Sequence, residues 1–121
     1  MPSIKQDRVA ENIRMILSEL LLREVSDPRL HNITVTDVTI DPELMFARVY
    51  INALGDESRH DEVMAALKKA KGFLRREVAK RVHLRSVPDL GFFWDETLER
   101  AERLNSLFSS LHIPPEDKKP G

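Results

Sequence analysis

Side chains that commonly carry out catalysis or bind metals are sparse in this sequence. The four histidines are scattered, and no two of them have the spacing of metal ligands. They are His31, His60, His83 and His112. Cysteine is absent, which excludes disulfides, thiolate nucleophiles and cysteine-ligated metal sites. The four glycines form no phosphate-binding loop. We therefore expect a non-enzymatic protein that has no cofactor and no metal site.

Two small groups of acids and histidine could pass for active-site clusters, but their positions favour a structural role. His60 and Asp61 stand at the expected start of a helix, where a polar residue caps and an acid suits the helix dipole. Asp95, Glu96 and Glu99 fall in the first turn of another expected helix. Because the dipole selects acids there, we interpret both groups as helix starts.

The one concentrated chemical feature is positive charge between Lys68 and Arg85. This stretch has eight basic residues and a single acid, Glu77, although the net charge of the whole chain is −1. The segment from Asp89 to Arg103 has the reverse balance, with five acids and two arginines. A polyanion at close range meets this local field, not the net charge.

The basic stretch predicts contact with RNA. Acids that could neutralise it at i±4 on a helix are nearly absent. A helix that starts after Gly72 would also offer unpaired N–H groups to phosphate. Helical phasing places Arg76, Lys80 and His83 on the outward side. The expected RNA-binding residues are Lys68, Lys69, Lys71, Gly72, Arg75, Arg76, Lys80, Arg81 and Arg85.

Two other interpretations of the charge stay open. The basic stretch could be a solvated face, since basic runs on surface helices are common. It could also meet an acidic protein while the acidic final helix meets a basic one, which would make the chain an adaptor between proteins. The near-zero net charge and the segregation of charge motivate this second alternative.

The aromatic run Phe92-Phe93-Trp94 also has two interpretations. It could stack on nucleic-acid bases. We favour alternate members in the core with only one face wet, because a strand packed under helices needs such bulk.

Hydrophobic periodicity predicts seven elements that form a two-layer α+β sandwich. The second strand belongs to an antiparallel hairpin, with alternating buried and wetter positions. Its expected buried set is Met45, Ala47, Val49 and Ile51, and its wetter set is Phe46, Arg48, Tyr50 and Asn52. The expected elements are helix 4–24, strand 33–40, strand 45–52, helix 59–71, helix 73–84 after an interruption at Gly72, strand 90–94 and helix 96–111.

The chain has room for one domain with one core. We expect this domain to span residues 1–112 and the polar, Pro-rich tail at 113–121 to be disordered. The start has no secretory signal, and no window is apolar for long enough to span a membrane, so we expect a cytoplasmic protein. No surplus apolar stripe remains, which favours a monomer.

Six segments, taken in order, carry a family resemblance that covers about residues 8–107. They are Arg8-Val9-Ala10-Glu11-Asn12-Ile13-Arg14, Arg23-Glu24-Val25-Ser26-Asp27-Pro28-Arg29-Leu30, Val35-Thr36-Asp37-Val38, Ala47-Arg48-Val49-Tyr50-Ile51, Ala70-Lys71-Gly72-Phe73-Leu74-Arg75 and Phe93-Trp94-Asp95-Glu96-Thr97-Leu98-Glu99-Arg100. This ordered set resembles bacterial ribosome-binding factor A.

The resemblance implies a type II KH-like fold, with the order helix-strand-strand-helix-helix-strand and an additional C-terminal helix. It also implies binding to the small (30S) ribosomal subunit through 16S rRNA, and a role in late 16S rRNA processing and subunit maturation. Growth in the cold and displacement by an assembly GTPase are further implied properties. No membrane and no small-molecule substrate are implied as partners.

One junction departs from ordinary KH domains, in which a Gly-x-x-Gly loop brings the backbone close to the nucleic acid. The corresponding junction is Ala70-Lys71-Gly72, the interrupted-helix form of this family. With a single glycine we expect a sharp kink and not a free loop. We therefore expect recognition of rRNA phosphates, not the four-nucleotide clamp of ordinary KH domains.

Overall fold

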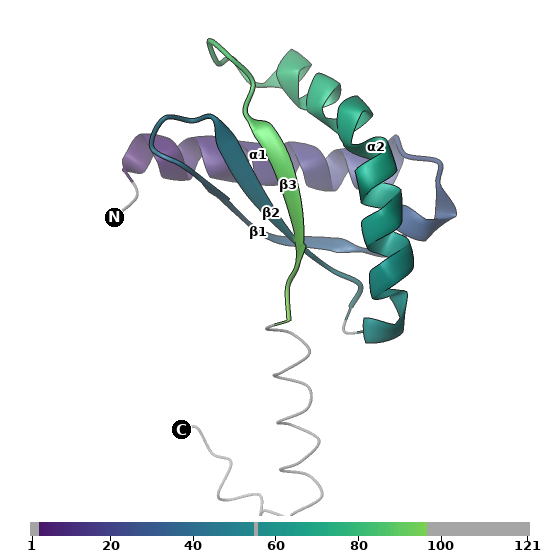
Figure 1. Ribbon diagram of the computed structural model, residues 1–121. Coiled ribbons are helices and arrows are strands. Elements are labelled where there is room, and N and C mark those ends of the chain that lie inside the picture. The colour runs from purple at the N-terminus through teal and green to yellow at the C-terminus, as the bar shows by residue number, and fades with distance from the viewer. Residues whose placement is uncertain (1–2, 55, 97–121) are drawn as a thin grey trace, which may run out of the picture.

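The computed structural model describes residues 3–54 and 56–96 and has an α+β fold with a three-stranded sheet (Figure 1). Its elements are the helix α1 (Ile4–Arg23), the short 3-10 helix η1 (Pro28–Leu30), the strands β1 (Thr34–Ile40) and β2 (Phe46–Asn52), the 3-10 helix η2 (Glu57–Arg59), the helix α2 (His60–Arg81) and the strand β3 (Asp89–Trp94). The expected final helix and the expected disordered tail lie outside the described residues, apart from Glu96 at the start of that helix.

The first helix confirms its prediction and begins with a capping box. The Ser3 hydroxyl accepts the N–H of Gln6, and the Gln6 side chain accepts the N–H of Ser3. These two bonds satisfy N–H groups that a helix start leaves unpaired. The apolar stripe of α1 is buried, and Pro28 follows four residues after the cap at Glu24.

The hairpin prediction is confirmed, because β1 and β2 pair antiparallel. The turn between them is held by Asp41, whose carboxylate accepts the N–H groups of Met45 and Phe46, both at 2.7 Å. These bonds lower the pKa of Asp41, the bond from Phe46 most. The next strand, β3, pairs parallel to β2 on its other side, and α2 makes the crossover between the two.

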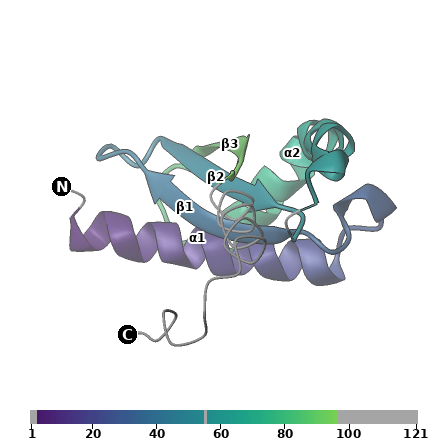
Figure 2. The same cartoon turned by 90° about the horizontal axis from the view of Figure 1, so that it is seen from below.

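Both main helices pack against one face of the sheet. Figure 2 shows α1 running beneath β1 and β2, with α2 on the side of β3. On β2 the side chains of Ala47, Val49 and Ile51 are fully buried in the core, as the alternation predicts. The opposite face of the sheet is covered by neither α1 nor α2.

Two positions of the predicted alternation were wrong. Met45 was expected in the buried set, but it lies before β2 and its side chain is exposed, because the Asp41 turn occupies this part of the chain. Asn52 was expected on the wetter face, but it is fully buried, and its amide donates to the carbonyl oxygen of Asp95 at 2.8 Å. A polar side chain can be buried there because this hydrogen bond replaces water.

The aromatic run divides as predicted, with alternate members on the two faces of β3. Phe92 and Trp94 are partly buried against the core. Phe93 lies on the other face and is 41% exposed. The rings of His60 and Trp94 meet in a T-shaped contact, with centroids 5.0 Å apart, which joins the start of α2 to the end of β3.

The prediction that Gly72 separates two helices was wrong, but the sharp kink predicted at this glycine is present. Helix α2 is continuous from His60 to Arg81, yet Figure 1 shows it turning sharply near its middle, where Gly72 lies. Continuity has a packing reason, because buried residues lie on both sides of the bend. They are Val63, Ala66 and Leu67 before it and Leu74 and Val78 after it. We call residues 60–71 of α2 the first arm and residues 73–81 the second arm.

Among the described residues, no helix is both long enough and apolar enough to cross a membrane.

Candidate RNA interface

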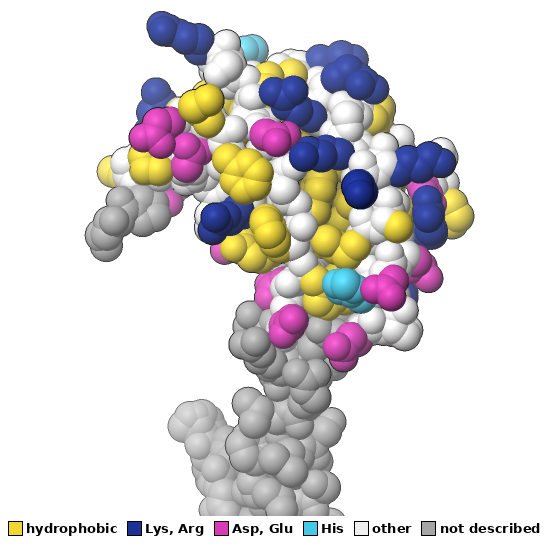
Figure 3. All heavy atoms as spheres, viewed as in Figure 1, with side chains coloured by type: hydrophobic (Ala, Val, Ile, Leu, Met, Phe, Trp, Pro, Cys, Tyr) yellow, Lys and Arg dark blue, Asp and Glu magenta, His cyan; other side chains and the backbone are white. Residues whose placement is uncertain are grey.

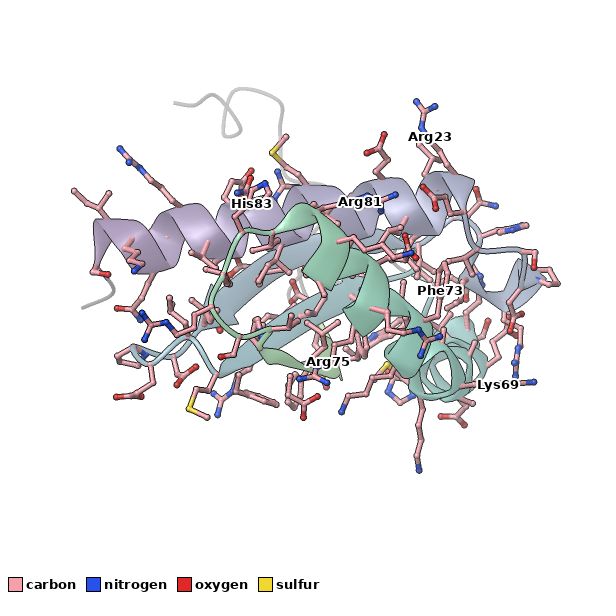
Figure 4. All side chains as sticks on the ribbon, turned by 90° about the horizontal axis from the view of Figure 1, so that it is seen from above. Arg23, Lys69, Phe73, Arg75, Arg81 and His83 are labelled. Atoms are coloured by element: carbon pink, nitrogen blue, oxygen red, sulfur yellow. The ribbon has the colours of Figure 1, made fainter. Side chains whose placement is uncertain are left out.

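The first arm of α2 carries two lysines that point to solvent. Lys68 and Lys69 are exposed, and neither has an ion pair or hydrogen bond with another described residue. Figure 4 shows Lys69 on the arm that is seen end-on. Its positive charge contributes slightly to lowering the pKa of Asp27, which lies beside η1. The two ammonium groups are therefore available to a polyanion.

The residues around the bend are tied to the segment that enters β3. Lys71 pairs with Asp89 at 3.3 Å. The guanidinium of Arg75 donates to the carbonyl oxygens of Val87 at 3.1 Å and of Pro88 at 3.4 Å. These bonds satisfy carbonyl groups that have no strand partner, and they fix the connection from α2 to β3. Lys71 and Arg75 thus already have a structural task.

The end of the second arm is partly neutralised by the single acid of the basic stretch and by an acid from another element. Lys80 pairs with Glu77 at 3.0 Å, and Arg81 pairs with Glu77 at 3.7 Å. The hydrogen bond from Lys80 lowers the pKa of Glu77. Arg81 also donates to Glu24 at the end of α1, at 2.9 Å. That acid lies 57 residues away in the sequence, so spacing along one helix could not reveal it.

Four of the eight expected cations make no ion pair or hydrogen bond with any described residue. They are Lys68, Lys69, Arg76 and Arg85, and all four are exposed. His83 is exposed as well, beyond the end of the helix (Figure 4). Figure 3 shows that Lys and Arg side chains gather over the part of the surface where α2 lies. This surface can bind phosphate groups through charge without any rearrangement of the core.

Of the two expected helix starts, only the one at His60 and Asp61 lies wholly within the described residues. His60 begins α2 but does not cap it, because the residue in the cap position is Arg59 and its side chain makes no capping bond. Asp61 and Glu62 lie in the first turn, as the helix dipole favours. The carboxylate of Asp95 accepts the hydroxyl of Thr36 at 2.5 Å and so ties β1 to the end of β3. In the described part of the chain, no three His, Asp or Glu side chains gather as metal ligands would.

The sequence as a whole matches one family of known proteins. The family model described as ribosome-binding factor A matches residues 5–108. A ribosome-binding factor A from Aromatoleum aromaticum is 41% identical over 107 residues, which are 88% of this chain and 84% of that protein. The chain belongs to the ribosome-binding factor A family. The resemblance seen in the six sequence segments is thereby confirmed.

Solved structures of ribosome-binding factor A have the same fold. The crystal structure of the protein from Thermus thermophilus is 27% identical, with a TM-score of 0.64 over 73% of this chain and 93% of that one. A homology model of the Thermus thermophilus protein, fitted into a cryo-EM map of a 30S complex, is 28% identical. Its TM-score is 0.59 over 71% of this chain and 90% of that one.

The sequence pattern predicted no role for Arg59, but the structure shows one. Arg59 donates to three backbone carbonyl oxygens beside η1: Arg29 at 3.1 Å, His31 at 2.8 Å and Asn32 at 3.3 Å. It therefore fastens the start of α2 to the loop that leads into β1. No local signal could have found it, because the three acceptors lie 27 to 30 residues earlier and are backbone atoms.

Proposed function

We propose that this protein is a non-enzymatic ribosome-assembly factor that binds the small (30S) ribosomal subunit through 16S rRNA. The observation that carries the proposal is a set of four exposed cations, three on the bent helix α2 and one just after it, that have no partner among the described residues, in a chain of the ribosome-binding factor A family. The similar Thermus thermophilus protein, which has been fitted into a map of a 30S complex, gives further support.

The contact surface divides into residues that bind phosphate and residues that shape the surface. Lys68, Lys69, Arg76 and Arg85 bind phosphate, because nothing in the described chain competes for them. The other predicted contact residues are Lys71, Gly72, Arg75, Lys80 and Arg81. Gly72 lies at the bend. Lys71, Arg75 and Arg81 connect the bent helix to its neighbours, Lys80 pairs with Glu77 within the second arm, and all four add to the local field. Two arms at an angle suit the shape of folded rRNA more than a base sequence.

The fold is KH-like and of type II, with the bend of α2 in the place of the Gly-x-x-Gly loop. The element order and the sheet with one covered face support this assignment. A helix that continues through Gly72 leaves no free backbone N–H groups for a four-nucleotide clamp. Mapping crosslinks from each arm to rRNA nucleotides tests whether the bend acts as a clamp. A clamp would give consecutive crosslinked nucleotides, whereas phosphate recognition would give scattered ones.

The biological role that follows is assistance in late 16S rRNA processing and subunit maturation in the cytoplasm, including growth in the cold, with release assisted by an assembly GTPase. The family supports this role. A bacterial strain that lacks its own ribosome-binding factor A tests it. The chain should restore cold growth and reduce precursor 16S rRNA, and failure to restore either would refute the role.

Charge reversal on α2 tests the site. Lys69→Glu combined with Arg76→Glu should abolish co-sedimentation with 30S subunits, because two phosphate contacts become repulsions. The matched control is Lys5→Glu combined with Arg8→Glu. It makes the same change in net charge on exposed residues, but at the N-terminal end of α1. Circular dichroism checks that both variants fold. If the α2 variant still co-sediments, the assignment of the site is wrong.

Salt dependence measures the number of phosphate contacts. The logarithm of the affinity should fall against the logarithm of the salt concentration with a slope of about −2 to −4, for three to five contacts. Lys69→Gln with Arg76→Gln should make the slope shallower by about 2. An unchanged slope would mean that these two residues do not touch phosphate.

The adaptor alternative has a specific prediction too. If the basic surface meets an acidic protein, nuclease treatment of a pull-down should leave every partner attached. If the chain binds rRNA as a monomer, nuclease should release its partners, and sedimentation of the free chain should give the mass of one copy.

A further inference from the structure

The sheet face that α1 and α2 leave uncovered carries a continuous aromatic strip. The side chains of Phe46, Tyr50 and Phe93 lie on this face, opposite to the buried positions of the same strands. The register places Tyr50 beside Phe93 and Arg48 beside Gly91. Figure 3 looks onto this face and shows hydrophobic side chains in its middle, with Lys and Arg side chains along the border toward α2.

The rings of Tyr50 and Phe93 contact each other, and the Phe46 ring lies next to Phe93 over Gly91. The ring centroids of Tyr50 and Phe93 are 5.8 Å apart, with the ring planes tilted by 35°. The Phe46 ring lies over Gly91, so closely that a Cβ there would be 2.6 Å from its Cζ atom. The same Cβ would be 3.2 Å from Phe93. The missing side chain of Gly91 therefore leaves room for the Phe46 ring over β3, on the same side as Phe93.

The charged groups near the strip indicate which kind of partner this surface can bind. Arg48 lies within it and is exposed, without an ion pair or hydrogen bond to any described residue. The two acids in neighbouring register positions are already engaged. Asp89 pairs with Lys71 and accepts the N–H of Leu90, and Asp37 accepts the N–H of Val38.

A cover of apolar side chains would bury Arg48 without a counter-ion, which is costly. An RNA single strand offers flat bases for the rings and phosphate for the guanidinium. Every base has a stacking face, so this site requires no particular sequence.

We propose that the strip of Phe46, Tyr50 and Phe93 stacks unpaired bases of an RNA single strand, with Arg48 holding its phosphate backbone. The inference rests on the proposed function, because it adds a site for a single-stranded segment to a surface that binds folded rRNA. The two sites differ in chemistry. The arms of α2 bind through charge, whereas the strip binds mainly through ring surface.

The experiment uses the full chain and an eight-nucleotide single-stranded RNA that contains 2-aminopurine, whose fluorescence falls when the base is stacked. Binding should quench the fluorescence. Phe93→Ala should weaken binding about 5- to 100-fold, which is the range for the loss of one stacked base, and should remove much of the quenching. The slope with salt should stay the same for this variant, because no phosphate contact is lost. The control is Leu22→Ala, which removes an exposed apolar side chain from α1, far from the strip.

Two further variants separate stacking from simple loss of apolar surface. Phe93→Leu keeps apolar bulk but not the ring, so it should still lose most of the quenching. Gly91→Ala should weaken binding while the chain remains folded, because the added methyl group displaces the far end of the Phe46 ring and no backbone. Arg48→Gln should make the salt slope shallower by about 0.7, the value for one contact to a single strand.

The outcomes distinguish this inference from the proposed function. If Phe93→Ala and Phe93→Leu bind and quench like the unchanged chain, the strip is not a stacking site, even where 30S co-sedimentation is normal. If the strip variants lower 30S binding but the RNA never quenches, the strip meets protein and the inference is overturned. If the unchanged chain quenches the RNA in a Phe93-dependent way but does not co-sediment with 30S subunits, the stacking site stands and the proposed function fails.

Discussion

The two arms of α2 carry similar numbers of basic residues, three and four, but the fold engages them differently. On the first arm, Lys68 and Lys69 have no partner among the described residues. On the second arm, Arg75 binds two backbone carbonyls and Arg81 pairs with Glu24 of the other helix. Charge density therefore identifies a candidate surface, but neighbours in space decide which charges are available. The first arm is suited to contact, and much of the second arm is engaged in structure.

The largest expected effect tests whether the second arm is a structural element. Leu74 is fully buried there, and Leu74→Ala should lower the free energy of unfolding by about 2–5 kcal/mol, because it removes apolar contacts and leaves a cavity. Urea denaturation followed by circular dichroism measures it. Leu22→Ala on the exposed side of α1 is the control and should change the same quantity by less than about 0.5 kcal/mol.

A smaller effect separates neighbouring arginines of the second arm. Arg75→Ala should destabilise the chain by about 1–2 kcal/mol, because the carbonyls of Val87 and Pro88 lose their donor. Arg76→Ala should leave stability within about 0.5 kcal/mol but weaken RNA binding, because Arg76 has no partner among the described residues. If the two substitutions changed stability equally, Arg75 would not be a structural cation in contrast to Arg76.

The bend itself can be tested at its glycine. The backbone φ of Gly72 lies outside the left-handed region that favours glycine. An added Cβ would meet only the end of the Arg76 side chain, at 3.4 Å. Gly72→Ala should therefore stabilise the chain by about 0.5–1 kcal/mol, since alanine is the better helix former. A thermal unfolding curve with a higher midpoint would support the continuous helix. A lower midpoint would mean that the bend needs glycine, as an interrupted helix does.

Most of the fold followed from periodicity, whereas much of the site did not. The stripe of α1 and the alternation of β2 repeat with the periods of helix and strand, so their buried residues could be predicted. The partners of the basic residues have no such period. Glu24 reaches Arg81 from another helix, and the acceptors of Arg75 are backbone atoms. The sequence could therefore predict which residues are basic and outward, but not which of them the fold neutralises.

Removing Glu24, one of the two acids that pair with Arg81, should make this cation more available to RNA. Glu24→Gln breaks the 2.9 Å pair with Arg81, and both side chains are partly exposed, so stability should fall by no more than about 1 kcal/mol. The affinity for rRNA should rise, because the field of the second arm is then less compensated. A filter-binding assay at two salt concentrations measures this rise, which should shrink at the higher salt concentration. Unchanged affinity would place Arg81 outside the contact surface.

The smallest expected effect concerns how independent the first arm is of the loop beside it. Asp27 has its pKa lowered to about 2, mainly by the hydrogen bond from the Arg29 side chain, and the charge of Lys69 adds the least of the named causes. Because the folded pKa lies below the unfolded value, the stability that Asp27 contributes is complete above about pH 4 and is lost as the pH falls toward 2. Asp27→Asn should therefore be less stable than the unchanged chain at pH 5, and this difference should disappear near pH 2. By contrast, Lys69→Gln should raise the Asp27 pKa, followed by carboxyl NMR titration, far less than Arg29→Gln does. If the two substitutions raised it equally, Lys69 would be bound to the loop and would no longer count as a free cation of the first arm.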